Sequence, residues 1–553
     1  MNVRAFRSFV IAGAIATAVA AATAPGSRVG ATGSPDAATN APGADAAHPL
    51  HLYISLSPTS LNPLLSTNAV DTDVALLIFD TLVAPDANNK LQPHLARVVP
   101  TRANGGISAD GKTVTFKLRD GLRWQDGTPL TSADVAFTFA KINDPKVDVN
   151  SRTGYDRITR VATPDAHTVV VSLREPFSPF VAYVGYQYPI VPKHLLDKSA
   201  NINHDPFGTH PVGAGPYRFE RWDRGNRVEL SANDAYYGGA PKIRDVIISE
   251  IPDQNTAALA FRSHEIDFGY VDSATFSQLR GAPGLTTTTE PNNDVVGYAL
   301  NVTRPILADV RVRRAISMAI DRASITRKTT LGTGTVAYAD LPAPLWIARE
   351  PANPYAYDPA AANALLDAAG WKRGPDGMRA KNGVSLSLRG IGFSGSAAMA
   401  SMNVQVEQLL RDIGIDFTSK QYSVSLYFES KQNGGPLAIG DYDMASLSWE
   451  GGIDPENDVL FTCASREPQG NNIARYCSPE MDALQDDSLR TLDPARRAAD
   501  IVKIERLAVT DVPYVFLYHT PWRIAQNPSL SRVHSSITET WNDVAAWSFA
   551  PTP

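Results

Sequence analysis

Strand-like and helix-like segments alternate along this chain, and this alternation limits the possible folds more than any other feature of the sequence. Residues 113–118 alternate apolar and polar side chains, as a half-buried β-strand does. Thr131 then lies three residues before Asp134, a spacing that is typical of a helix capping box. No internal repeat of solenoid length is present. The pattern therefore predicts an α/β fold.

The length of the chain indicates more than one lobe. At 553 residues it is too long for a single hydrophobic core, so two or three lobes are expected. Two further helices are predicted: one begins at Pro359 and is stopped by Gly370, and another occupies residues 309–322. One stripe of the second helix is apolar and is expected to face the core. Three of its arginines are expected mostly to face solvent: Arg311, Arg314 and Arg322.

The N-terminal segment has the pattern of a secretory signal peptide. Arg4 and Arg7 form a basic start, and residues 9–22 are apolar, with small side chains toward the end. The alternative, a transmembrane anchor, needs roughly 20 apolar residues, more than this run supplies. We therefore expect a signal peptide over residues 1–24, cleaved on export, and a disordered linker over residues 25–48. No cysteine lies near the end of the apolar run, so a periplasmic protein without a lipid anchor is expected.

The two cysteines of the chain, Cys463 and Cys477, lie close together in the sequence. In an exported protein such a pair favours one disulfide bond over the alternative of two free thiols. Two isolated cysteines with no histidine beside them make a poor zinc site, and no metal site is expected. The formal net charge of −6 argues against nucleic acid as a partner.

Six separate segments, found in the same order, carry a family resemblance. They are residues 61–135, 213–219, 230–239, 261–268, 298–301 and 309–322. These segments resemble the bacterial extracellular solute-binding proteins of family 5, which feed peptide and nickel ABC importers. The resemblance extends over residues 50–547, which is nearly the whole chain after the expected signal peptide. The cysteine pair is also similar to a disulfide of the dipeptide-binding branch.

The resemblance implies a class II periplasmic binding protein-like fold of the α/β type. Two lobes would be joined by crossover strands near residues 292–301 and 511–518, and a third lobe would be inserted. The implied boundaries are 49–85, 208–295 and 520–553 for lobe I, 86–207 for the inserted lobe II, and 296–519 for lobe III. Proteins of this kind act as monomers without a cofactor: they enclose a solute between two lobes and deliver it to a permease.

The segment that begins at Trp449 is the main candidate for ligand contact. In the peptide-binding relatives, the equivalent tryptophan packs on the ligand and an aspartate three residues later binds the ligand's α-ammonium group. Here Gly452 stands at the aspartate position. A buried ammonium without a carboxylate partner costs several kcal/mol. Either Glu450 or Asp454 substitutes, or the ligand presents no free N-terminus at this point.

Other residues near this segment have two interpretations. Trp449 is either a cleft residue or a core residue, and the neighbouring Gly451 and Gly452 favour the cleft because glycine lets a ligand approach closely. Tyr298, on a crossover strand, and Tyr186, on a segment expected to be irregular, are further candidates for ligand contact. For each tyrosine, packing in the core is an equal alternative.

These features indicate the substrate-binding component of an ABC importer, which would take a peptide or peptide-like solute and dock on permease subunits in the inner membrane. An extended peptide bonded through its main chain tolerates variation in sequence. A nickel-chelate carrier of the same fold is the alternative. A secreted hydrolase is a remote alternative, because residues 392–396 resemble a nucleophile elbow but their second glycine comes one residue early. The protein is therefore not expected to be an enzyme.

Overall fold

The computed structural model describes residues 48–66, 68–342, 345, 355–531, 537, 541 and 543–550. The signal peptide expected over residues 1–24 and nearly all of the linker expected over residues 25–48 lie outside the described residues. Within the described ranges, no helix combines the length and the apolar character that a membrane crossing requires.

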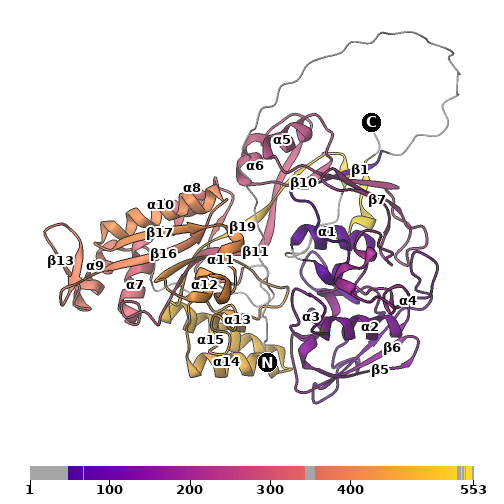
Figure 1. The fold of residues 1–553 in the computed structure, drawn as a ribbon, viewed down its shortest axis with the longest axis horizontal. Helices are drawn as coiled ribbons and strands as arrows, with labels where there is room; N and C mark the ends of the chain where they lie inside the picture. The colour runs from indigo at the N-terminus through magenta and orange to yellow at the C-terminus, as the bar shows by residue number, and fades with distance from the viewer. Residues whose placement is uncertain are drawn as a thin grey trace, which may run out of the picture.

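One sheet of 11 strands runs through the molecule (Figure 1). Its strands are β1 (Leu50–Ile54), β7 (Tyr217–Asp223), β8 (Arg227–Ala232), β9 (Asp245–Glu250), β10 (Phe268–Tyr270), β11 (Thr286–Leu300), β12 (Thr335–Val336), β16 (Ser387–Phe393), β17 (Asp416–Tyr422), β18 (Met444–Glu450) and β19 (Tyr514–Gln526). Their order is β17-β16-β18-β11-β19-β10-β1-β9-β8-β7, with β12 paired to β19. Mixed strand directions and helices on the faces confirm the predicted α/β class.

The long antiparallel strands β11 and β19 connect the two lobes. In the near lobe, which contains β1 and β7 to β10, the second half of β19 pairs with β10 on one side and with the first half of β11 on the other. In the far lobe, which contains β12 and β16 to β18, the second half of β11 pairs with β18, and the first half of β19 pairs with β12. The register shifts between Glu290 and Asp294, where the strands leave the near lobe. Gly297 permits close pairing farther along, because an added Cβ would lie 2.3 Å from the Val515 carbonyl oxygen. The two lobes are thus joined by crossover strands, as predicted.

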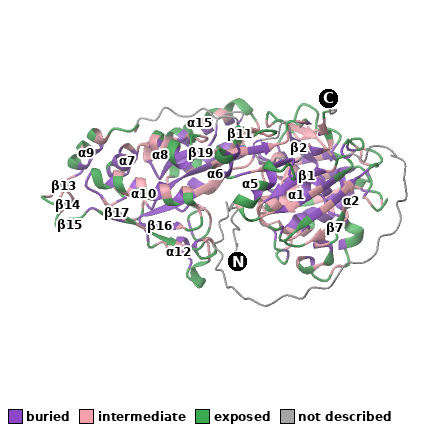
Figure 2. Cartoon of the chain, turned by 90° about the horizontal axis from the view of Figure 1, so that it is seen from above, coloured by how far each residue is buried: buried purple, intermediate pink, exposed green. Residues whose placement is uncertain are grey.

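Helices cover both faces of the far-lobe sheet. One face carries α7 (Val310–Ala319), α8 (Arg322–Thr329), α9 (Pro359–Ala368) and α10 (Ala397–Asp412), and the other carries α11 (Val424–Tyr427), α12 (Pro436–Ile439), α13 (Asp458–Phe461), α14 (Pro479–Arg490) and α15 (Pro494–Asp511). A small hairpin sheet is formed by β13 (Lys372–Arg373), β14 (Arg379–Lys381) and β15 (Val384–Ser385). Figure 2 shows buried residues following the strands through the molecule, with exposed residues on the outside.

Two local predictions for the far-lobe helices are confirmed and one is wrong. The apolar stripe of α7 is buried, and α9 begins at Pro359 with Gly370 beyond its end. Arg322 does not face solvent: it is buried and donates to the Phe516 carbonyl oxygen at 2.7 Å and the Ser317 carbonyl oxygen at 3.0 Å. These bonds offset the desolvation of its guanidinium group, which lets an arginine occupy an interior position.

The near lobe and the inserted segment share one hydrophobic core. Their remaining elements are α1 (Ala69–Ile78), β2 (Val83–Pro85), β3 (Leu91–Pro93), β4 (Thr113–Lys117), α2 (Ser132–Asn143), β5 (Ile158–Asp165), β6 (Thr168–Leu173), α3 (Phe180–Tyr186), α4 (Lys193–Leu196), α5 (Gln254–Arg262), α6 (Ser273–Leu279), β20 (Leu530–Ser531) and β21 (Ser548–Phe549). Strand β4 and the capping box of Thr131 and Asp134 confirm the sequence interpretation. The segment that carries Tyr186 was expected to be irregular, but it is helical.

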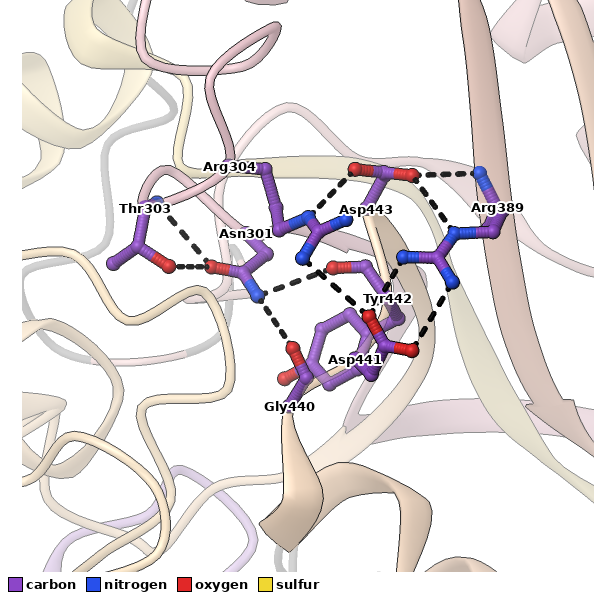
Figure 3. Close-up of polar contacts among 8 residues, drawn as sticks. All are labelled: Asn301, Thr303, Arg304, Arg389, Gly440, Asp441, Tyr442 and Asp443. Atoms are coloured by element: carbon purple, nitrogen blue, oxygen red, sulfur yellow. Dashed lines mark hydrogen bonds and ion pairs between the residues drawn. The ribbon is translucent and has the colours of Figure 1, made fainter.

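A polar network fixes the start of β18 (Figure 3). The backbone N–H of Arg389 donates to Asp443 Oδ2 at 2.8 Å, and Arg304 Nε donates to Asp443 Oδ1 at 3.1 Å. Asn301 Nδ2 donates to the Tyr442 carbonyl oxygen at 3.1 Å. These bonds tie the beginning of β18 to its neighbours β16 and β11. The opposite end of β18 carries Trp449 and Glu450 and lies beside the part of β11 where its register with β19 shifts.

Candidate functional site

Trp449 and Glu450 lie on opposite faces of the same strand end. In the β18–β11 pair, Trp449 is opposite Val295 and Glu450 is opposite Asp294. Trp449 is partly buried and packs against the core cluster that contains Val295 and Leu447. Successive side chains of a strand point to opposite faces, so Glu450 joins Asp294 on the other face. The structure therefore gives Trp449 both core packing and partial exposure.

Asp294 and Glu450 form an acidic pair where the strands leave the far lobe. Asp294 accepts hydrogen bonds from Ser448 Oγ, at 3.3 Å, and from Thr520 Oγ1. Burial raises the pKa of Asp294 to about 6. Burial, followed by the charges of Asp294 and Asp73, raises the pKa of Glu450 to about 8. Asp73 belongs to α1 in the near lobe, so carboxylates of both lobes influence this point.

Contacts within the chain explain the first of the two glycines after Glu450 but not the second. Gly451 N–H donates to the Asn293 carbonyl oxygen at 3.0 Å, and Asn293 Nδ2 donates to the Gly452 carbonyl oxygen at 2.5 Å. A Cβ on Gly451 would lie 2.6 Å from Asn293 Nδ2. A Cβ on Gly452 would lie 3.4 Å from the Tyr183 hydroxyl oxygen, an ordinary contact. Gly451 is thus needed because the chain packs closely against the crossover strand at this point. The sequence analysis had instead attributed this glycine to close approach of a ligand.

Asp454 is bound to another residue of the far lobe, which corrects the expectation that it could substitute for the missing aspartate. Arg497 Nη1 donates to Asp454 Oδ2 at 2.7 Å, and Arg497 Nη2 donates to Asp454 Oδ1 at 2.5 Å. Both side chains are buried. A bidentate pair of this kind uses both carboxylate oxygens. Asp454 is therefore held by an ion pair within the far lobe, and Glu450 remains the candidate of the two carboxylates named from the sequence.

Tyr298 does not reach the space between the lobes, so the expectation of ligand contact is corrected. Its side chain is 0% exposed in the far-lobe core, packs edge-on against Phe417, and donates its hydroxyl to Asn403 Oδ1. Tyr186 is partly buried against the core of the near lobe. Its hydroxyl oxygen is buried and has no hydrogen-bond partner among the described residues. Core packing therefore accounts for Tyr298, whereas ligand contact by Tyr186 stays a prediction.

Several residues of this region were missed by sequence reasoning. They are Asp73, Asn293, Asp294, Glu456 and Arg497. Asn293 and Asp294 lie within the predicted crossover strand, so their place in the fold could be inferred from the sequence. Nothing in the sequence indicated that Asp294 would lie opposite Glu450. Asp73, Glu456 and Arg497 contact or influence residues that are distant in the sequence. A single sequence contains no pattern that predicts such long-range contacts.

A disulfide bond joins Cys463 to Cys477, as predicted. Between them, Asn472 Nδ2 donates to the carbonyl oxygens of Thr462, at 3.0 Å, and Tyr476, at 2.8 Å. The bond and these contacts close the loop that follows α13. This loop continues the chain from the Trp449–Asn457 segment, so the disulfide stabilises the far-lobe side of the candidate site.

Comparisons with known proteins identify a family and relatives of similar sequence. The family model described as bacterial extracellular solute-binding proteins, family 5 Middle, matches residues 90–471. Protein XP55 of Streptomyces lividans is 30% identical over 484 residues, which cover 86% of this chain and 84% of the relative. The oligopeptide-binding protein AppA of Bacillus subtilis is 26% identical over 468 residues, which cover 84% of each chain.

Solved structures show the same fold. The structure of AppA from Bacillus subtilis in complex with a nonapeptide superposes with a TM-score of 0.75 at 24% identity, covering 91% of this chain and 99% of that one. The structure of NikZ from Campylobacter jejuni in complex with Ni(L-His) also gives a TM-score of 0.75 at 24% identity, with 90% and 99% coverage. Because the family model matches well over half of the sequence, the chain belongs to the bacterial extracellular solute-binding proteins of family 5.

Proposed function

We propose that this protein is the substrate-binding component of an ABC importer, and that it captures a peptide or peptide-like solute between its lobes. Family membership supports the solute-binding role, and the name of AppA, an oligopeptide-binding protein, supports a peptide ligand. The observation that carries the proposal is the end of β18, where Trp449 and Glu450 lie beside the crossover strands. An aromatic side chain offers a large apolar contact area, and a carboxylate can bind an ammonium group by a charge-assisted hydrogen bond.

Glu450 and Asp294 are proposed to bind the α-ammonium group of the ligand. The raised pKa values of both groups reflect burial and, for Glu450, the charge of Asp294. An ammonium group placed between them would favour the charged form of both carboxylates. In this arrangement Asp294 and Glu450 together do what Gly452, at the aspartate position of the relatives, cannot do.

The transport context follows from the same proposal. The protein would be exported to the periplasm, act as a monomer, and deliver its solute to permease subunits in the inner membrane. The extracellular character of the family supports export. Lobe movement would occur about β11 and β19, because their register shift near Glu290 and Asp294 interrupts the ladder between the lobes.

The test is a calorimetric titration with paired peptides that differ only in N-terminal acetylation. The wild-type protein should bind the free peptide, and acetylation should weaken binding by roughly tenfold or more, because a charge-assisted bond is lost. The Glu450→Gln substitution should weaken binding of the free peptide and should change the affinity for the acetylated peptide little. Glu265→Gln, an exposed carboxylate on the near lobe, is the matched control. Equal affinity for both peptides would overturn the assignment of Glu450 and Asp294.

A further inference from the structure

The two lobes touch a second time at a rim away from the crossover strands, where residues 175–178 of the inserted segment meet the end of α14 (Figure 1). These inserted residues lie between β6 and α3. Ser178 N–H donates to the Leu489 carbonyl oxygen at 2.7 Å, and the Ser178 hydroxyl donates to the Thr491 carbonyl oxygen. The last carbonyl groups of a helix have no partner within the helix. A residue of one lobe therefore caps a helix of the other lobe.

The side chain of Leu489 is buried in the opposite lobe. It belongs to α14 of the far lobe, but it is 7% exposed and packs in the hydrophobic cluster of the near lobe and the inserted segment. Among the described residues from 296 to 519, no other buried hydrophobic side chain is a member of that cluster. Leu492 also comes close to the inserted segment, because a Cβ added to Gly111 would lie 2.6 Å from Leu492 Cδ1. The rim contact therefore has an apolar centre.

An ion pair and a further hydrogen bond accompany this apolar centre. Arg490 Nη2 lies 3.0 Å from Glu175 Oε2, and the Tyr183 hydroxyl donates to Glu456 Oε2. The Arg490 side chain is 50% exposed, so water screens its pair with Glu175 and the pair contributes little. Burial of a leucine side chain contributes more, because removal of apolar area from water is not screened in this way. Leu489 is therefore expected to dominate the contact.

The rim contact belongs to one arrangement of the lobes. The near lobe and the inserted segment share one core, and the far lobe has cores of its own on the two faces of its sheet. The lobe movement proposed for β11 and β19 therefore separates Ser178 from Leu489. Leu489 then becomes exposed to water, and the carbonyl groups at the end of α14 lose their partner. Opening of the rim thus costs free energy whether or not a solute is bound.

Building on the proposed function, we propose that Ser178 and Leu489 form a clasp that retains the solute between the lobes. A solute enclosed between the lobes enters and leaves only when the lobes part, and the lobes part only when the clasp opens. Opening of such a closure often sets the rate of release. The clasp acts without touching the solute, so weakening it speeds the release of every peptide by a similar factor. Glu450, in contrast, is proposed to distinguish peptides by their N-terminus.

Hydrogen exchange of the empty protein, read at residue level by mass spectrometry, tests the clasp without any solute. The Ser178 amide should be protected in the wild-type protein, because its N–H is bound while the rim is closed. Leu489→Ala should speed its exchange by roughly tenfold, the effect expected when a leucine side chain loses most of its apolar contact. Leu484→Ala is the matched control: Leu484 lies on the same helix but packs against the far-lobe core, so the Ser178 amide should be unchanged.

A second variant, Ser178→Ala, removes the hydroxyl bond to Thr491 and leaves the backbone amide in place. The amide at position 178 should then exchange roughly threefold faster, after correction for its intrinsic rate. Circular dichroism confirms that each variant is folded. A wild-type Ser178 amide that exchanges as fast as in an unstructured peptide would overturn the clasp. Wild-type exchange in both Leu489→Ala and Ser178→Ala would overturn it as well, and so would an equal acceleration in Leu484→Ala.

Release of solute provides the second arm, with a pool of short synthetic peptides as the probe and native mass spectrometry after dilution as the readout. Leu489→Ala should release every bound peptide roughly threefold faster or more, and Leu484→Ala should release them at the wild-type rate. Unchanged release from Leu489→Ala, or faster release of only some peptides, would overturn the role in retention. Failure of every peptide to bind the wild-type protein would contradict the proposed function, and hydrogen exchange alone would then decide whether the clasp exists.

Discussion

Asp294 and Glu450 occupy directly opposite positions on the antiparallel strands β11 and β18. Side chains so placed share one face of the sheet, with Cβ atoms about 4.5–5.5 Å apart, and like charges in this position destabilise the pair. The arrangement costs the empty protein free energy at a pH where both groups ionise. A cationic group bound between them would remove that cost, which is typical of a binding site rather than of a structural ion pair.

Glu450→Gln should stabilise the empty protein at about pH 8 and leave it unchanged at about pH 4. Burial and the charge of Asp294 raise the pKa of Glu450 from 4.5 to about 8 in the folded state. The associated stability is fully present below the unfolded pKa and is lost as the pH rises through the folded pKa. Because Glu450 is partly exposed, we expect a gain of about 1–2 kcal/mol at the higher pH, measured by urea unfolding. A loss of stability at that pH would contradict the account.

Trp449→Ala should weaken peptide binding by about 2 kcal/mol, as removal of an aromatic anchor does. Since Trp449 is only partly buried, the loss of unfolding free energy should stay below the about 3–5 kcal/mol expected for a fully buried tryptophan. Trp547, which is 0% exposed in the near-lobe core, supplies the matched comparison as Trp547→Ala. If Trp449→Ala is as destabilising as Trp547→Ala and leaves binding intact, Trp449 is a core residue.

Arg497→Met should lower the free energy of unfolding by about 3–5 kcal/mol, because it leaves the buried Asp454 without its partner. Replacing both members of the pair, in Arg497→Met with Asp454→Leu, should recover most of the loss. Chemical denaturation of the single and double variants measures both effects, and an additive double variant would show that the two side chains do not act as a pair.

Replacing Cys463 and Cys477 together by serine should lower the free energy of unfolding by about 3 kcal/mol. The two residues are separated by 14 positions, and closing a loop of about this size restricts the unfolded chain by that amount in the chain-entropy model. Peptide mapping of a non-reduced digest of the wild-type protein should find the two cysteine peptides linked. Two freely alkylated thiols in that digest would contradict the bond.

Predictions from the sequence succeeded where the signal was local. The alternation over residues 113–118 corresponds to β4, and the spacing of Thr131 and Asp134 gives the cap of α2. Each depends on side chains a few positions apart, so neighbouring residues determine the structure. The crossover strands were also predicted, because the family resemblance implied them. The disulfide was predicted from the close spacing of the two cysteines.

The details of the site could not be predicted in the same way. Asp454 is bound to Arg497, 43 positions away, and no pattern in one sequence marks that pair. Tyr298 was placed on the correct strand but its face was not known, and a shift of one residue moves a strand side chain to the opposite face. Arg322 was expected in solvent because its buried carbonyl partners come from tertiary structure.

Native mass spectrometry of the protein purified without refolding tests the central claim most directly. If the protein is a peptide-binding receptor, part of the population should carry solute from the cell, released on denaturation and identified by fragmentation as peptide. Glu450→Gln should retain less of it than the Glu265→Gln control. A released metal chelate, or protein that carries no solute and binds no member of a peptide pool, would contradict the claim.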